Sequence, residues 1–299
     1  MRRIFPSLTV ILLLALVLGW MIQRQLEYAQ LGKHVAAGAG FFSNIALWLE
    51  SGYFDSTADA KPLLHLWSLG IEEQFYIAFP ILVFLAWRLR IARAPLLFVI
   101  GAGSFAASLF LVTRDPSAAF FLPHARCWEL IAGCLLASIV DSGGEVSASM
   151  TRVPRLRSLV SIAGALLIIA GFMQIDTTRD FPGVWALLPV AGAASLIWAG
   201  PEAFLNRRLL TQPLLVWIGL ISFQLYLWHW PLLVFLQMTR PENSGFASRA
   251  LAIAASFPLA CVELAFDLAE CRAVRRIGRR SKAGIDDPPS GLDRRELER

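Results

Sequence analysis

Eight apolar runs constrain the fold of this chain more than any other feature of the sequence. They lie at about residues 4–23, 68–87, 95–113, 126–140, 158–175, 183–199, 214–237 and 247–268. A transmembrane helix needs about 20 mostly apolar residues, and a helix satisfies its own backbone groups within the hydrocarbon. The 299 residues are 57% hydrophobic and only 16% charged. Charged residues usually make up about a quarter of a soluble domain. We therefore expect an all-α, polytopic integral membrane bundle of about eight spans.

Basic residues gather in every second connection between these runs. They are Arg2 and Arg3, then Arg88, Arg90 and Arg93, then Arg152, Arg155 and Arg157, then Arg207 and Arg208, and finally the run from Arg272 to Lys282. The positive-inside rule places all of them in the cytoplasm, so we expect both termini inside the cell. The net charge of +5 is explained by this topology, and we expect no nucleic-acid partner.

This alternation places Arg3 and Arg88 on the same side of the membrane. It therefore requires that the segment 33–49 between them does not cross the membrane. We expect a re-entrant or interfacial helix there, since its glycines and alanines suit close packing and Trp48 suits a membrane interface. The run 4–23 is too long for a signal peptide and lacks a small-residue cleavage site, so we interpret it as a retained span.

The sequence divides into two parts. Residues 1–270 form one transmembrane domain, and residues 271–299 form a basic, then polar, cytoplasmic tail in which we expect no regular structure. The chain has no Walker motif, no HExxH and no GxSxG, which excludes nucleotide hydrolysis, zincin proteolysis and α/β-hydrolase chemistry. The four cysteines lack ligand spacing, so we interpret them as core residues and expect no metal site.

Charged groups lie inside the apolar span of residues 68–87, within the block PLLHLWSLGIEEQFYIAFP at 62–80. Counting back from its inner end places Glu72 and Glu73 roughly 6–8 Å inside the hydrocarbon. An ionised carboxylate there costs several kcal/mol unless it is paired or hydrated, which makes both glutamates candidates for function. Consecutive helical side chains point about 100° apart, so the two cannot easily share a partner. His65 shares a face with Glu72 if the helix extends that far.

Other ionisable groups fall in the outer half of the membrane by the same count. Arg126 and Glu129 begin one inward-running span, and His229 lies about 22 Å from the inner side of another. One interpretation is a polar cavity open to the outside, with Arg126 as the partner of a glutamate and His65 or His229 as a proton carrier. The alternative is that Arg126 and Glu129 pair with each other as i,i+3 neighbours. We interpret His34 and His124 as interfacial bystanders.

Four blocks in the same order resemble the membrane acyltransferase 3 family, whose enzymes O-acylate cell-surface glycans such as lipopolysaccharide O-antigen. The blocks are RRIFP at 2–6, SNIALWLESGYFD at 43–55 followed by residues 62–80, HARCWELIAGCLLA at 124–137 and WIGLISFQLYLWHWPLL at 217–233. The resemblance implies transfer of an acyl group, commonly acetyl, from cytosolic acyl-CoA to a sugar hydroxyl of a lipid-linked or nascent glycan. The enzyme would act in the bacterial inner membrane with no bound cofactor.

The candidate site residues divide by role under this resemblance. The catalytic candidates are Glu72, Glu73, His65 and His229, because a sugar hydroxyl needs a base to remove its proton. The acceptor-binding candidates are Arg126, Glu129, Trp67, Trp128 and Tyr226. Arg2 and Arg3 are the candidates for the anionic donor, although orientation alone also explains them. Trp67, Trp128 and Trp228 could stack on a sugar ring or simply anchor the interface.

The sequence also departs from the family pattern. Members usually begin with two further spans, the first carrying a histidine thought to be catalytic, and this sequence opens after that point. FDLAECRAVRR keeps Glu270 of the closing motif but lacks its proline. Two alternatives to an active enzyme therefore stay open. One is a truncated, catalytically silent fragment. The other is a transporter of small solutes or lipid-linked sugars, because buried charges also mark permeation paths.

Overall fold

The computed structural model describes residues 4–51, 60–141, 154–176, 178–239 and 245–286, with the backbone alone for 141 and 267–286. Its elements in chain order are α1 (Ile4–Ile22), α2 (Gln25–Ala39), α3 (Ser43–Glu50), α4 (Leu66–Arg88), α5 (Arg93–Val112), α6 (Pro116–Phe121), α7 (Pro123–Asp141), α9 (Pro154–Gln174), η2 (Gly183–Ala186), α10 (Leu187–Ala199), η3 (Asn206–Leu210), α11 (Pro213–Thr239) and α12 (Phe246–Asp286). No strand occurs within these ranges.

The helices confirm an all-α membrane bundle. Seven helical stretches of the described chain are long and apolar enough to cross a bilayer. The eighth expected span is shorter and runs from Gly183 to Ala199 as η2 continued by α10. At ~1.5 Å per residue it is about 25 Å long, slightly less than a typical hydrocarbon core.

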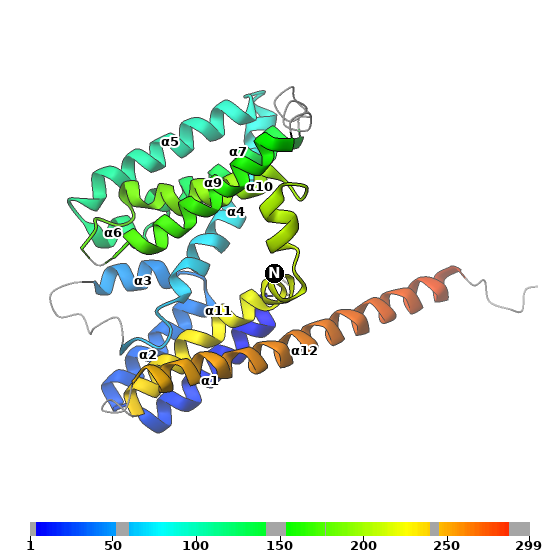
Figure 1. Cartoon of the computed structure of the whole chain (residues 1–299). Coiled ribbons are helices and arrows are strands. Elements are labelled where there is room, and N and C mark those ends of the chain that lie inside the picture. Colours follow the sequence, from blue (N-terminus) through cyan, green and yellow to red (C-terminus); the bar gives the residue numbers. More distant parts are fainter. Residues whose placement is uncertain (1–3, 52–59, 142–153, 177, 240–244, 287–299) are drawn as a thin grey trace, which may run out of the picture.

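The helices form two groups with α4 between them (Figure 1). α5, α7, α9 and α10 pack together in one group, and α1, α2, α11 and α12 pack together in the other. α4 contacts α2 and α3 as well as α5 and α7, so it links the groups. Buried leucines of α1, α4 and α11, such as Leu8, Leu66 and Leu227, meet in a core cluster at this junction.

The connections separate to opposite sides of the bundle, as the charge alternation predicts. The α1–α2 turn and α6 lie on one side in Figure 1, and the α4–α5 turn, η3 and the start of α1 lie on the other. We refer to the side of the α1–α2 turn and α6 as the outer side, following the positive-inside prediction. The assignment of that side to the cell exterior stays a prediction.

Two segments differ from the expectation. Residues 33–49 form parts of two helices rather than one, because Phe41 adopts a left-handed φ of 58° that ends α2 and re-aims the chain into α3. The backbone also stays helical to Asp286, where we expected no regular structure from residue 271. Extending an existing helix needs no new nucleation, and the alanines and arginines there are strong helix formers. Residues 287–299 lie outside the described residues.

The close packing of α9 on α10 gives a first test. A Cβ atom added at Gly192 would lie 2.6 Å from Ile168 Cγ1 and 2.7 Å from the carbonyl oxygen of Gly164. We expect Gly192→Ala to destabilise the fold by about 1–3 kcal/mol, because the backbone of α9 cannot move away without opening the interface. Thermal unfolding in detergent, followed by tryptophan fluorescence, measures the change.

Gly103→Ala on α5 is the matched control for this test. A Cβ there meets no atom within 4 Å, so the melting temperature should stay the same or rise slightly. Equal melting temperatures for the two variants would contradict the close α9–α10 contact.

Candidate functional site

His65, Ser68, Tyr226 and His229 come together where α4 meets α11, and we call them the histidine cluster. The ring of His65 lies 5.2 Å from that of Tyr226 and 6.0 Å from that of His229, measured between centroids. The Tyr226 hydroxyl donates to the backbone carbonyl of His65 and lies 3.0 Å from Ser68 Oγ. The structure thus joins three of the predicted site residues across two distant parts of the sequence.

The hydrogen bond of His229 determines which of its nitrogens can take a proton. Its Nδ1 lies 3.0 Å from the carbonyl oxygen of Leu225. A carbonyl oxygen only accepts, so Nδ1 carries the hydrogen and Nε2 keeps its lone pair in the neutral ring. Burial, together with the nearby His229, lowers the pKa of His65 to about 3, so the His65 ring is neutral at physiological pH and resists protonation. The proton acceptor that the cluster offers is therefore Nε2 of His229.

Glu72 and Glu73 differ in their surroundings, as expected for consecutive helical residues. Glu73 is buried, with 1% of its surface exposed, whereas Glu72 is half-buried. Glu72 lies close enough to Tyr226 to interact with it electrostatically. Of the two carboxylates, Glu72 is therefore the one that is near the histidine cluster.

Asn44 and Gln74 hold α4 just after the glutamates, and sequence reasoning missed both. Gln74 Nε2 donates to the carbonyl oxygen of Phe41 and to Asn44 Oδ1, each at 2.9 Å. The fully buried Asn44 donates in turn to the carbonyl oxygen of Phe121 at 3.1 Å. The available signal was a pair of amides in otherwise apolar segments, which must find partners once they are buried.

Arg126 lies among three aromatic rings, and we call this arrangement the arginine cage. Its guanidinium carbon is 5.2 Å from the ring centre of Trp67, 5.6 Å from Phe120 and 5.4 Å from Phe181, within cation–π range. Arg126 Nε is 3.1 Å from Glu129 Oε1. Three of the acceptor-binding candidates, Arg126, Glu129 and Trp67, are thus together, but the glutamate partner of Arg126 in the described chain is its i,i+3 neighbour rather than Glu72 or Glu73.

A cavity of about 340 Å³ adjoins the arginine cage. Arg126, Glu129 and Phe181 line one part, and small or aliphatic side chains of α7 and α10 line the rest. Arg126 Nη1 is buried and has no hydrogen-bond partner among the described residues. The cage therefore retains a donor that is able to meet a polar ligand.

Trp128 and Trp228 do not present the open ring faces that the sequence suggested. Trp128 is buried between α5 and α7, with its ring 4.9 Å from that of Phe105. Trp228 is buried between α11 and α12, where its indole Nε1 donates to Glu263 Oε2 at 2.6 Å. Both rings fill helix–helix contacts, so stacking on a sugar is corrected to a packing role for these two.

His34 is not an interfacial bystander, because it belongs to a buried ionic group that we call the acid–base triad. His34 Nε2 lies 2.7 Å from Glu50 Oε2, and Lys61 Nζ lies 3.3 Å from the same oxygen. Burial alone would raise the pKa of Glu50, but the hydrogen bond from His34 and the two neighbouring positive groups hold it below its ordinary 4.5. The triad ties α2, α3 and the segment before α4 together.

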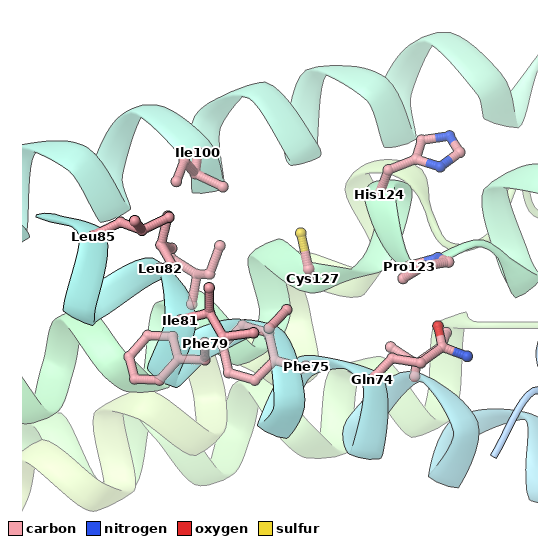
Figure 2. A pocket seen from close by; sticks show the side chains of 13 residues that line it. Gln74, Phe75, Phe79, Ile81, Leu82, Leu85, Ile100, Pro123, His124 and Cys127 are labelled. Atoms are coloured by element: carbon pink, nitrogen blue, oxygen red, sulfur yellow. The ribbon is translucent and has the colours of Figure 1, made fainter. Parts of the chain in front are cut away.

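An apolar cavity of about 550 Å³ lies between α4, α5 and α7 (Figure 2). Phe75, Phe79, Leu82 and Ile100 are among its lining residues, and His124 and Gln74 lie at the same end on opposite sides of Pro123 in Figure 2. A lining of this kind suits a hydrocarbon chain whose polar end meets His124 and Gln74.

Arg2 and Arg3 lie outside the described residues. Within the described ranges, no group of three or more His, Cys, Asp and Glu side chains could hold a metal ion.

Comparison with known proteins identifies the family. A model of the family described as "Acyltransferase domain" matches residues 1–262. The chain belongs to this acyltransferase 3 family. All the clusters described above lie within the matched residues. No solved structure matched the chain.

Relatives in this acyltransferase 3 family include both shorter and longer proteins. An uncharacterized protein of Haemophilus influenzae is 29% identical over 206 residues, which cover 66% of this chain and 82% of that protein. The peptidoglycan O-acetyltransferase OatA of Listeria monocytogenes is 29% identical over 290 residues, which cover 90% of this chain and 44% of that protein. The putative peptidoglycan O-acetyltransferase YrhL of Bacillus subtilis is 27% identical over 246 residues, which cover 78% of this chain and 38% of that protein. The chain spans less than half the length of the two O-acetyltransferases.

The amide pair beside the glutamates of this acyltransferase 3 chain gives a second test. Asn44→Ala removes a buried partner of both Gln74 and the Phe121 carbonyl. Each buried group left unpaired costs about 1–3 kcal/mol, so the variant should unfold at a clearly lower temperature. Ser222→Ala is the control, because that hydroxyl is exposed and donates to the carbonyl oxygen of Gly219 within α11. A melting temperature equal to that of the control would argue against this support for α4.

The acid–base triad gives a third test, which depends on pH. Because the folded-state pKa of Glu50 is lowered, its stabilisation is complete above about pH 4.5 and is lost as pH falls through the folded-state pKa. At pH 7 we therefore expect Glu50→Gln to be less stable by about 1–3 kcal/mol. The difference in melting temperature between the wild-type protein and Glu50→Gln should become smaller below about pH 4.

Glu202→Gln is the control for the pH experiment, since Glu202 is exposed in the connection before η3. Its melting temperature should follow the wild-type protein at every pH. A gap for Glu50→Gln that stays constant from neutral to acidic pH would show that the carboxylate charge does not stabilise the triad.

Proposed function

We propose that this chain is an O-acyltransferase that moves an acyl group, in the first instance acetyl, from acyl-CoA to a sugar hydroxyl of a cell-envelope glycan. The observation that carries the proposal is the histidine cluster in a member of the acyltransferase 3 family. His229 donates from Nδ1 to Leu225 and so keeps Nε2 as a proton acceptor, and Tyr226 holds His65 beside it.

The reaction needs one base and one leaving group. The sugar hydroxyl oxygen attacks the thioester carbonyl carbon while His229 Nε2 takes the hydroxyl proton. The carbon–sulfur bond then breaks, coenzyme A leaves as a thiolate, and this thiolate receives the proton to become the free thiol. The negative charge of Glu72 near the cluster stabilises the imidazolium while the proton is held.

The anionic part of the donor and the acceptor approach from opposite sides of the membrane in this proposal, and the acyl thioester extends from the inner side to the histidine cluster. We place both termini in the cytoplasm of a bacterium, in the inner membrane, so Arg2 and Arg3 meet the anionic donor on that side. The segregation of the connections to two sides supports this division. The acceptor approaches the outer ends of α4, α7 and α11, where the histidine cluster and the arginine cage lie.

The acceptor glycan is proposed from two observations. The named relatives are peptidoglycan O-acetyltransferases, which supports a glycan of N-acetylated sugars. The apolar cavity of Figure 2 can hold the hydrocarbon tail of a lipid-linked form of that glycan. Lipopolysaccharide O-antigen, the acceptor first expected from the sequence, is compared directly in the experiment.

The fourth test measures transfer of labelled acetyl from acetyl-CoA to glycan in membrane vesicles. We expect His229→Gln to reduce the rate at least about 100-fold, because general-base catalysis contributes that much or more. Glu72→Gln and Glu73→Gln should abolish transfer while leaving membrane insertion intact. Supplying peptidoglycan precursor and O-antigen in parallel identifies the acceptor.

Ser222→Ala on α11 and Glu202→Gln are the matched controls, and both should keep full activity. Undiminished transfer by His229→Gln and by both glutamate variants would overturn the assigned roles. Wild-type protein without transfer to either glycan would identify the chain as a catalytically silent fragment. Movement of a lipid-linked sugar across proteoliposomes without any acyl donor would favour the transporter instead.

A further inference from the structure

A second polar cavity, of about 480 Å³, lies at the outer ends of α1 and α11 and along the start of α2. We call it the outer cavity. Its lining includes Met238, which is nine residues beyond His229 on α11 and therefore about 13 Å further toward the outer side. It also includes Lys61, four residues before His65. The outer cavity thus lies on the outer side of the histidine cluster and is separate from it.

The side chains of the outer cavity are polar and carry charges of both signs, and the Lys61 ammonium is paired with Glu50, 3.3 Å away. Gln23 and Gln30 supply amides, Arg24 and Lys61 supply positive charge, and Glu27 supplies negative charge. His34 also lines the cavity, and Glu50 fixes its ring through the 2.7 Å hydrogen bond. Such a mixture of donors and acceptors suits a neutral ligand rich in hydroxyl and amide groups better than an anion.

One of the side chains that line the outer cavity carries an unsatisfied polar atom. Gln23 Oε1 is buried and has no hydrogen-bond partner in the part of the chain that the structure describes. Its amide nitrogen lies 3.8 Å from the sulfur of Met238, a weak acceptor. A buried acceptor without a donor is destabilising, so a ligand that donates a hydrogen bond there would gain affinity.

We propose that the outer cavity is a glycan subsite, which binds an N-acetylated sugar unit next to the unit that is acylated. An acetamido group carries one donor and one acceptor, which match the side-chain amides of Gln23 and Gln30. The sugar hydroxyls meet Arg24, Glu27 and His34. Because Lys61, four residues before His65, also lines the cavity, we place neighbouring units of one glycan chain in the outer cavity and at the histidine cluster. This inference rests on the proposed function, because it takes the acceptor to be a glycan.

Two measurements test the subsite. In the first, N,N′-diacetylchitobiose is added to purified wild-type protein, and at several times its Kd we expect the melting temperature to rise by about 2 °C or more. Gln23→Leu and Gln30→Leu should each reduce this shift. Gln212→Leu is the matched control, since Gln212 is exposed just before α11, at the end opposite to the outer cavity, and its side chain donates to the carbonyl oxygen of Arg208. The control should keep the full shift.

The second measurement compares acceptors of one and two sugar units in the acetyl-transfer assay. Gln23→Leu should raise KM for the two-unit acceptor about five- to tenfold, corresponding to one lost hydrogen bond, with kcat unchanged. KM for the single sugar should stay as in the wild type. His229→Gln should instead lower kcat for both acceptors, which separates the subsite from the chemistry.

The outcomes distinguish the subsite from the proposed function. If chitobiose raises the melting temperature and Gln23→Leu reduces that rise, the subsite is supported even where no acetyl transfer is detected. Transfer that depends on His229 but is unaffected by Gln23→Leu and Gln30→Leu, for both acceptors, overturns the subsite and leaves the proposed function standing. The subsite is also overturned if chitobiose leaves the melting temperature unchanged while inorganic phosphate raises it and Arg24→Gln removes that rise. The outer cavity is then an anion site.

Discussion

The segment from Lys61 to Gln74 depends on hydrogen bonds from its neighbours, and the rest of the site depends on that segment. Trp230 Nε1 donates to the carbonyl oxygen of Lys61 at 3.0 Å, and Tyr226 donates to that of His65. At the other end Gln74 donates to the carbonyl oxygen of Phe41. Backbone groups that are not helical must find internal partners at membrane depth. The same bonds that satisfy them place His65 beside His229.

Three polar groups surround this segment, and each joins different helices. The histidine cluster joins α4 to α11, the arginine cage joins α4 to α6 and α7, and the acid–base triad joins α2 to α3 and the segment before α4. α4 takes part in two of them and links the two helix groups. The proposed chemistry therefore lies where the two helix groups meet.

Local features of the site were predictable from the sequence, and distant pairings were not. Arg126 and Glu129 are one helical turn apart, so their pairing follows from helix geometry alone. His34 and Glu50 are 16 residues apart on two helices, and their pairing depends on the left-handed Phe41 that separates α2 from α3. The burial of Trp128 and Trp228 depends on which helices pack together. Such choices rest on three-dimensional packing rather than on spacing along the chain.

The sequence by itself determined the membrane bundle, the alternation of its connections and the family, because apolar length, charge placement and motif order are properties of a linear chain. Only the tertiary structure decided which polar groups meet. It brought His65 to His229 across more than 160 residues, kept Arg126 with Glu129, and formed the outer cavity around Gln23. The physical reason is that buried polar groups in a bilayer must be satisfied within the protein, and the packing of helices from distant parts of the chain selects their partners.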